Sequence, residues 1–458
     1  MKNAGTRDIT KKTNRLKCEN IFLILSVVFG LAYTLFQPIF IEPDSSYHFE
    51  HVTYISNTVV DRGSLGFNGE DYQQNFDYFS SENRNGTYFQ KFFKTKLPVV
   101  NKEKVQDKRV IGSTWLNDIK HVIPAVGVKI SRVIYPSIAI MVIGGRLFNL
   151  IFFILSLYFI IKYLKAYQLL FTVISVSPTV IQFATSLSYD CYNYVAFAYM
   201  AATLINIAVD MENQHHPSFL QLVYRLSLPS IVLYFSKSNS KILYLMVAMF
   251  FVYWFFERLK IEFSKKKKLM IGISVFFIAV LGFLVTYHNQ LGLITRKFFY
   301  TILEPNYTIL STEILSGASG SVPLWFYPIE VMGVIFLLLS VKKESVPRWF
   351  ALSCLLIVII NLVGVSFQYS IMPAFGEKVI TGSQGRYFTS FILLLGPIFS
   401  VISIKNFLSV TGKYLKPIII LISIVSLVLN LSIISLKFYH LKVPSGRYRS
   451  DSESMILK

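Results

Sequence analysis

Long uninterrupted runs of apolar residues are the feature that most restricts how this 458-residue chain can fold. Several runs reach about 17 residues or more, the length that an α-helix needs to cross the hydrocarbon core of a bilayer. Within lipid, only helices and closed barrels satisfy every backbone hydrogen bond, and these runs do not alternate as barrel strands do. The sequence therefore predicts an all-α polytopic membrane protein, folded as one integral membrane domain over residues 1–458.

The boundaries of the apolar runs predict about 11 transmembrane helices, with roughly 10 to 13 compatible with the same pattern. Two runs are shorter than the others, and the third contains the pair Ser177-Pro178. The expected spans cover residues 20–40, 137–163, 167–187, 192–209, 220–235, 242–256, 269–287, 325–341, 349–367, 388–403 and 417–436.

Basic residues give the chain its net charge of +20, and their placement orients it. They precede the first span and gather in alternate short connections, for example in the run KKKK at 265–268, as the positive-inside rule describes. This distribution argues against a nucleic-acid partner. It predicts a plasma-membrane protein with a cytoplasmic N-terminus. Residues 42–135 then form a long extracytoplasmic loop with amphipathic or re-entrant helices.

Charged residues at the ends of spans are the candidate functional residues, because ionisable groups near lipid are costly and usually face a cavity or a partner. Asp44, Asp190, Lys241 and Arg386 all fall on the outer side in this topology. A carboxylate in low-dielectric surroundings is a candidate general base. Asp44 and Asp190 also suit the N-cap of the helix that follows each of them, so catalysis and capping both stay open.

The basic candidates suit a phosphate group. Arg386 follows Gly385 in SQGRYF, and its planar guanidinium matches phosphate geometry, although snorkelling at the interface is an alternative. Lys241 in SKSNSK is the second candidate, with Lys237 as its rival. Arg146 lies inside the second span, and we expect it to be a structural intramembrane residue paired with another polar group.

His48 and His51 lie three residues apart and share a helix face, and His48, one turn from Asp44, is the histidine expected in the catalytic cavity. No further ligands complete a zinc site around them, so no metal site is predicted there. A divalent cation held by Asp44 and Asp190 stays open as a cofactor. Walker, Rossmann and metalloprotease motifs are absent from the sequence, which argues against ATP-driven transport.

Five short motifs occur in the order EPDSSYHFEHVTYI, GGRLFNL, SPTVIQFATSLSYD, SKILYL and SQGRYF. With them the chain, from about residue 21 to 403, resembles the bacterial multi-pass family known as domain of unknown function 2142. It also looks like a member of the GT-C superfamily of membrane glycosyltransferases. The first motif of the family usually has a Glu where this chain has Ser45, which leaves Asp44 as the sole carboxylate directly after Pro43.

The resemblance implies transfer of a sugar from a polyprenyl-phosphate donor to a cell-surface glycan or another envelope acceptor, with inversion at the anomeric carbon. Asp44 matches the supposed base of the family, and Asp190 matches a second acidic residue by position. Arg386 and Lys241 are implied to hold the donor phosphate. Two other functions stay open. A flippase or transporter of lipid-linked glycans predicts midplane charges and broken helices, and a non-catalytic membrane scaffold is compatible with Ser45.

Overall fold

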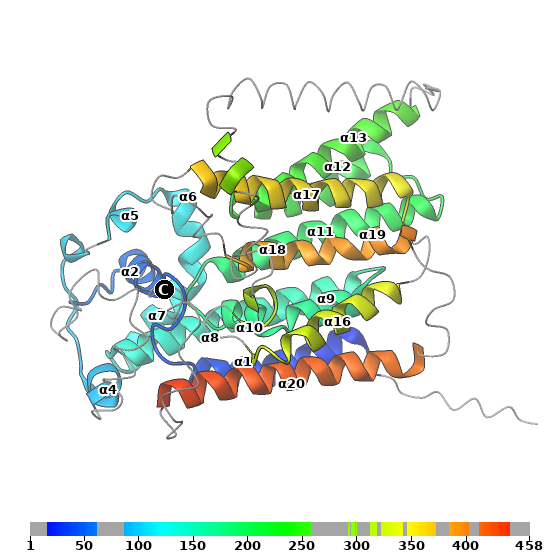
Figure 1. The fold of residues 1–458 in the computed structure, drawn as a ribbon. Coiled ribbons are helices and arrows are strands. Elements are labelled where there is room, and N and C mark those ends of the chain that lie inside the picture. Colours follow the sequence, from blue (N-terminus) through cyan, green and yellow to red (C-terminus); the bar gives the residue numbers. More distant parts are fainter. Residues whose placement is uncertain are drawn as a thin grey trace, which may run out of the picture.

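The computed structural model describes residues 16–61, 87–105, 107–258, 312–317, 322–341, 346–371, 384–402 and 412–439, and positions 292, 293, 295–297 and 299. This part of the chain is helical, and its one strand-like feature is an isolated bridge between Val60 and Val99. Figure 1 shows the long helices side by side in a bundle, with a group of shorter helices at one end.

Five described helices are long and apolar enough to cross a membrane: α1 (Cys18–Phe36), α8 (Ile138–Tyr163), α11 (Asp190–Glu212), α17 (Arg348–Ile371) and α20 (Gly412–Tyr439). Shorter apolar helices lie among them, namely α12 (Phe219–Tyr234), α13 (Leu243–Arg258), α16 (Tyr327–Leu339), and α18 (Arg386–Thr389), which leads into α19 (Leu395–Ile402). The predicted all-α membrane class is confirmed. The predicted span at 269–287 lies outside the described residues.

The third predicted span, 167–187, is not one helix but two, α9 (Gln168–Ser175) and α10 (Pro178–Ala184). Pro178 has no N–H to continue the hydrogen bonds of α9, and its fixed φ suits the first position of a new helix. The prediction of a single span was wrong here because a proline after Ser177 starts α10 instead of kinking a longer helix.

Helix α11 is the centre of the bundle. In its most apolar window 78% of the residues are buried, against 33% for the corresponding window of α20 at the edge. It packs against α8, α12 and α13, and Figure 1 places it between α12 and α13 on one side and α8 on the other. Small residues on α11 let the backbones of its neighbours approach, including the buried Ala196, Ala198, Ala201 and Ala208.

The segment after α1 folds into a helical layer over one end of the bundle, which we call the cap (residues 42–61, 87–105 and 107–135). It contains α2 (Ser45–Ser56), α4 (Thr87–Phe89), a π-helical turn (Gln90–Lys94), 3₁₀ turns (Lys102–Lys104 and Ile119–His121), α5 (Lys108–Ile111), α6 (Trp115–Asp118) and α7 (Val122–Ile134). Phe49, Val52, Phe92 and Val128 of the cap belong to a second apolar cluster, which also includes Phe40 and the start of α8. The expected first loop is therefore a packed substructure in its described part.

Helix α7 pairs closely with the first half of α8, and glycines make this approach possible. A Cβ on Gly144 would lie 1.6 Å from Ser131 Oγ, and one on Gly127 would lie 2.3 Å from the Gly144 carbonyl oxygen. No side chain fits in either place. The motif GGRLFNL thus serves first to bring the cap against the bundle.

Arg146 joins the cap to the bundle. Its side chain is fully buried and forms an ion pair with Glu42, with Nε donating to Oε1 at 2.8 Å. Its Nη1 donates to the Gln37 carbonyl at 2.7 Å and its Nη2 to the Pro38 carbonyl at 2.8 Å, directly after α1 ends at Phe36. These contacts satisfy backbone carbonyls that the end of α1 leaves unpaired.

Arg146 therefore lies part-way along α8, inside the second predicted span, and level with the end of α1. It follows the start of α8 at Ile138 by eight residues, so the first part of α8 extends about 12 Å beyond that level into the cap. The partner that the sequence left unnamed is Glu42, which comes directly after the first apolar run.

We expect Arg146→Met to destabilise the protein strongly, because it leaves the Glu42 carboxylate buried without a cation, at a cost of about 3–5 kcal/mol. Thermal unfolding of detergent-purified protein measures the effect. The double variant Arg146→Met/Glu42→Gln should recover much of the loss. Lys162→Met, at the exposed far end of α8, is the matched control and should change stability by less than about 0.5 kcal/mol. Equal stability of the single variant and wild type would contradict this role of the ion pair.

Candidate functional site

Asp44 lies at the junction of α1 and the cap, in a left-handed backbone conformation with φ 55°. Non-glycine residues rarely adopt this region, and strained conformations of this kind gather at functional sites. α2 begins at Ser45 as the sequence predicted, but the Asp44 side chain does not cap it. Asp44 occupies the predicted N-cap position, but its side chain forms no capping hydrogen bond, because its backbone is left-handed and not extended as in capping residues. The side chain is instead 41% exposed and lies within ion-pair distance of Arg386.

Asp190 is the first residue of α11, and Tyr189 occupies the N-cap position. The Asp190 side chain caps nothing, so this capping prediction is also wrong. Its carboxylate is buried, with 8% of the side chain exposed, and forms an ion pair with the ammonium group of Lys237. Asp190 is thus a buried anion held by fixed cations.

Arg386 joins the two aspartates. Its Nη2 lies 3.4 Å from Asp44 Oδ2, and its Nη1 lies 3.3 Å from Asp190 Oδ2. Its side chain is 4% exposed. Residues separated by more than 300 positions therefore form one charged cluster where α2, α11 and α18 meet, and Figure 1 shows these elements near the cap end of the bundle.

Lys237, not the favoured Lys241, contacts the Asp190 carboxylate. The Lys237 backbone N–H donates to Asn193 Oδ1 at 2.7 Å, and Asn193 lies one turn after Asp190 on α11, which brings the Lys237 side chain to Asp190. Lys241 instead lies over the ring of Tyr234, with 5.0 Å between Nζ and the centroid. Lys241 lies within the 3₁₀ turn Ser240–Ile242, whereas Lys237 precedes this turn, so the two side chains contact different neighbours.

Lys120 is a cation of the site that the sequence analysis missed. Its Nζ lies 5.0 Å from the ring centroid of Tyr189. Burial lowers the pKa of Lys120, and the nearby ammonium groups of Lys241 and Lys237 lower it further, against the attraction of Asp190. Burial likewise lowers the pKa of Lys237, with Arg386 adding to the effect and Asp190 opposing it. Crowded ammonium groups of this kind favour an anionic ligand.

Glu313 is a second residue that the sequence did not single out. Its Oε2 accepts a hydrogen bond from the Gly385 N–H at 3.1 Å, next to Arg386. Burial raises the pKa of Glu313, while the Arg386 guanidinium opposes the rise. The Ile314 carbonyl accepts from Thr389 Oγ1 at 2.7 Å, so the segment 312–317 supports α18 and the position of Arg386. No local motif around Glu313 indicates this contact.

Histidines form the wall of the site on the cap side. His48 Nδ1 lies 2.9 Å from His121 Nε2, and the ring of His51 stacks on His121 with 4.2 Å between centroids. His51 Nε2 lies 2.8 Å from Asp118 Oδ1. His48 is near enough for Asp190, Arg386 and Lys237 to influence its pKa. The sequence pattern HxxH found His48 and His51, whereas His121 and Asp118 come from a distant segment and carry no such signal.

The two aspartates do not fit a shared divalent cation. The guanidinium of Arg386 lies between their carboxylates, at 3.3–3.4 Å from one oxygen of each, in the place where a bridging metal ion would bind. Among the described residues, no group of three or more His, Cys, Asp and Glu side chains is arranged to hold a metal ion.

Apolar helices of membrane-spanning length with charged residues gathered at one end define an integral membrane protein. The chain belongs to the family described as predicted membrane protein (DUF2142), whose model matches residues 27–395. The family resemblance seen in the five motifs is thereby confirmed. No curated protein and no solved structure matched the chain in the corresponding comparisons.

We expect the stability of the protein to fall between pH 7 and pH 5. Burial lowers the pKa of His48 to about 3, and burial also lowers the pKa values of His51 and His121. Below the unfolded value of 6.5, the unfolded chain binds protons that the folded state does not, so the free energy of unfolding decreases with falling pH. At pH 5, His48 alone accounts for about 2 kcal/mol.

Thermal unfolding in detergent at pH 7.5, 6.0 and 5.0 checks this expectation. His48→Gln should reduce the dependence, whereas the exposed His215→Gln is a control that should retain it. A wild-type unfolding midpoint that stays constant over this range would contradict the neutral, buried state of these rings.

Proposed function

We propose that this protein is a membrane glycosyltransferase of the GT-C type, which moves a sugar from a polyprenyl-phosphate donor to a cell-surface glycan or another envelope acceptor on the outer face of the membrane. The observation that carries the proposal is the cluster of Asp44, Arg386, Asp190 and Lys237 at one end of the helix bundle. This arrangement pairs an accessible carboxylate with cations at the boundary of the apolar helices.

Asp44 is the better general base of the two aspartates. Its side chain is 41% exposed, and its ion-pair contacts are long, at 3.4 Å to Arg386 and 3.8 Å to Arg109. Asp190 is buried and contacts both Lys237 and Arg386. A base needs a free lone pair within reach of the acceptor proton, so Asp44 takes this role and Asp190 positions the two cations.

Arg386 and Lys237 are the groups proposed to hold the donor phosphate, with Lys120 and Lys241 close by. Lys120 and Lys241 have no carboxylate partner within 4.0 Å in the described part of the chain, so they can accept a new anion. Arginine suits the phosphate because its planar fork donates two hydrogen bonds in parallel. The alkyl part of the donor would lie along the apolar helices.

The proposed reaction is a single displacement. Asp44 removes the proton from an acceptor hydroxyl as its oxygen bonds to the anomeric carbon of the sugar. The bond from that carbon to the phosphate oxygen breaks, and the electron pair leaves with the polyprenyl phosphate. Negative charge grows on the leaving phosphate, where fixed cations in a water-poor site stabilise the transition state most effectively. One displacement inverts the anomeric centre.

His48 has no direct contact with an acceptor in this proposal. It is buried, its Nδ1 faces His121, and its ring lies 5.0 Å from that of Tyr189. We assign it to the wall that supports α2 and hence Asp44. Its predicted catalytic role stays a prediction.

Two features favour a second candidate function, a flippase or transporter of lipid-linked glycans. The helix pair α9–α10 is broken at Ser177-Pro178, and Glu330 is buried in the apolar helix α16. Broken helices and buried charges within the membrane are typical of transporters. The charged cluster at the end of the bundle, where a donor headgroup would lie, favours the transferase.

We expect Asp44→Asn to abolish the glycan modification, with a loss of roughly 100-fold or more, because removal of a general base costs about that much. The measurement is sugar composition of the cell envelope in a strain that lacks the gene and carries the variant, with the protein level in the membrane checked in parallel. Normal modification by Asp44→Asn would contradict the base assignment.

Asp61→Asn is the matched control, because Asp61 is a cap carboxylate that pairs with Lys104 away from the cluster. It should restore the modification fully. Unchanged glycan composition in the deletion strain, with lipid-linked precursors accumulating on the cytoplasmic face, would instead support the transporter.

A further inference from the structure

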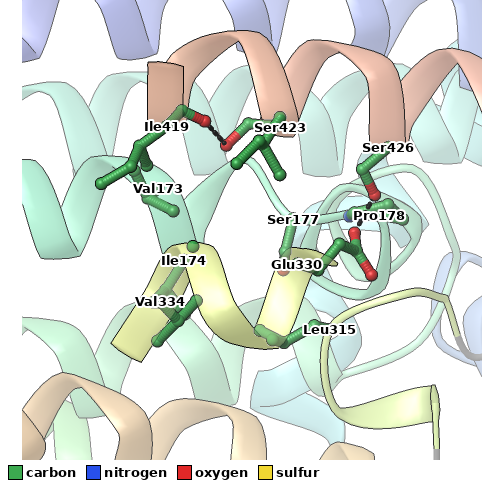
Figure 2. A pocket seen from close by; sticks show the side chains of 12 residues that line it. Val173, Ile174, Ser177, Pro178, Leu315, Glu330, Val334, Ile419, Ser423 and Ser426 are labelled. Carbon is green, nitrogen blue, oxygen red and sulfur yellow. Dashed lines mark hydrogen bonds between the residues drawn. The ribbon is translucent and has the colours of Figure 1, made fainter. Parts of the chain in front are cut away.

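A small cavity lies inside the bundle, away from the charged cluster. It has a volume of about 30 Å³ and is lined by residues of α9, α16, α20 and the segment 312–317. Ser177, which lines the cavity, and the turn that leads to Asp190 lie at opposite ends of α10. The seven residues of this helix span roughly 10 Å. Figure 2 shows Glu330 and Ser177 together in this cavity.

Glu330 is the acidic residue of the cavity. It is 7% exposed and lies in the first turn of α16. One carboxylate oxygen accepts a hydrogen bond from Ser316 Oγ and the other accepts from Ser426 Oγ on α20. Figure 2 shows the contact with Ser426. Both hydroxyls donate, so each carboxylate oxygen is already the acceptor of one hydrogen bond.

The Glu330 carboxylate has no cationic partner among the residues that the structure describes. Within the described part of the chain, no Lys, Arg or His nitrogen lies within 4.0 Å of the Glu330 carboxylate. The other cavity walls are mainly apolar, with Val173, Ile174 and Val334 among them. An ionised carboxylate in such surroundings is costly by several kcal/mol unless a positive charge accompanies it.

Ser177 supplies an independent sign of a ligand. Its side chain is 7% exposed, lines the same cavity, and its Oγ has no hydrogen-bond partner. Buried hydroxyls without a partner are rare in folded proteins, so each one needs an explanation, and a bound ion is one such explanation. Ser423 Oγ, also in the cavity, donates to the Ile419 carbonyl at 3.1 Å and keeps lone pairs for another contact.

We propose that this cavity binds one dehydrated alkali cation, held by the Glu330 carboxylate and the hydroxyl oxygens of Ser177, Ser423 and Ser426. The volume suits one body of about the size of a water molecule. Oxygen atoms are the ligands that hard cations prefer. A single carboxylate balances one positive charge, whereas a divalent ion would leave an uncompensated charge in an apolar site.

The cation would stabilise the break between α9 and α10. It joins Ser177, at that break, to α16 and α20, and Ser316 ties the same carboxylate to the segment 312–317. Glu313 in this segment accepts from the N–H of Gly385, beside Arg386. Occupancy of the cavity thus supports the helices that position the charged cluster, whichever reaction takes place there.

Thermal unfolding of the detergent-purified, full-length protein tests the proposal at constant ionic strength, in NaCl, KCl or choline chloride. We expect the unfolding midpoint to be roughly 2–5 °C higher in the alkali salt that binds, with a saturable dependence on its concentration. Comparison of NaCl with KCl identifies the preferred cation. Equal midpoints in all three salts would overturn the proposal.

Glu330→Gln should remove the difference between the alkali salts and choline chloride. Ser177→Ala should raise the concentration for half of the effect by roughly fivefold, since it removes one neutral ligand. Glu19→Gln is the matched control, because Glu19 is equally buried at 7% exposure but lies in the first turn of α1 and does not line the cavity. This variant should keep the response. An alkali-salt response that persists in Glu330→Gln would overturn the assignment.

If Glu330→Gln does not fold, a direct binding measurement on the wild-type protein tests the same proposal. The wild-type protein should bind about one equivalent of ²²Na⁺ or ⁸⁶Rb⁺ that excess unlabelled alkali salt displaces and choline does not, and Ser177→Ala should bind it more weakly. Absence of displaceable binding of both tracers to the wild-type protein would overturn the proposal. Neither result bears on the glycosyl-transfer proposal, which is tested by Asp44→Asn.

Discussion

The buried ion pair between Arg146 and Glu42 is the contact on which the architecture at the end of the bundle depends. It holds the chain directly after α1, through the Gln37 and Pro38 carbonyls, against a helix that extends into the cap. Asp44 follows Glu42 by two residues, so the same contact fixes the place where the candidate base leaves the bundle. Because both charges are buried, neither is stable without the other. The glycine contacts between α7 and α8 then close the cap over this point.

The charged cluster is arranged so that its carboxylates differ in environment. Asp190 is buried against Lys237 and Arg386, whereas Asp44 is partly exposed and contacts its cations at longer distance. A buried anion holds cations in fixed positions, and an accessible anion can exchange a proton. This division of roles follows from burial and distance. Lys120 and Lys241 lie nearby and have no carboxylate within 4.0 Å among the described residues, which supports the proposal of an anionic ligand.

The deeper cavity and the cluster share the segment 312–317. Ser316 binds the Glu330 carboxylate, and Glu313, three residues earlier, binds the backbone beside Arg386. Asn430 Nδ2 donates to the Ser316 carbonyl at 2.7 Å, and Asn430 Oδ1 accepts from Tyr33 on α1 at 2.7 Å. Polar contacts within apolar helices are specific in direction, because few alternative partners exist in lipid. The segment therefore has one defined position, and both sites depend on it.

The sequence by itself determined the class of the protein, because apolar runs of membrane-spanning length can only become helices in lipid. It also singled out Asp44, Asp190 and Arg386 as candidates, because charges at the ends of such runs are costly, and the structure brings the three into one cluster. The local sequence could not show which of Lys237 and Lys241 contacts Asp190. The contact of the Lys237 backbone with Asn193 and the 3₁₀ turn at Lys241 decide this in the folded protein. The sequence could not show that the Asp44 side chain leaves α2 uncapped, because this depends on the left-handed backbone conformation of Asp44. His121, Lys120 and Glu313 became part of the site only through contacts between distant segments. The tertiary structure alone decided these, because burial and ion pairing depend on which helices meet and not on the spacing within any one of them.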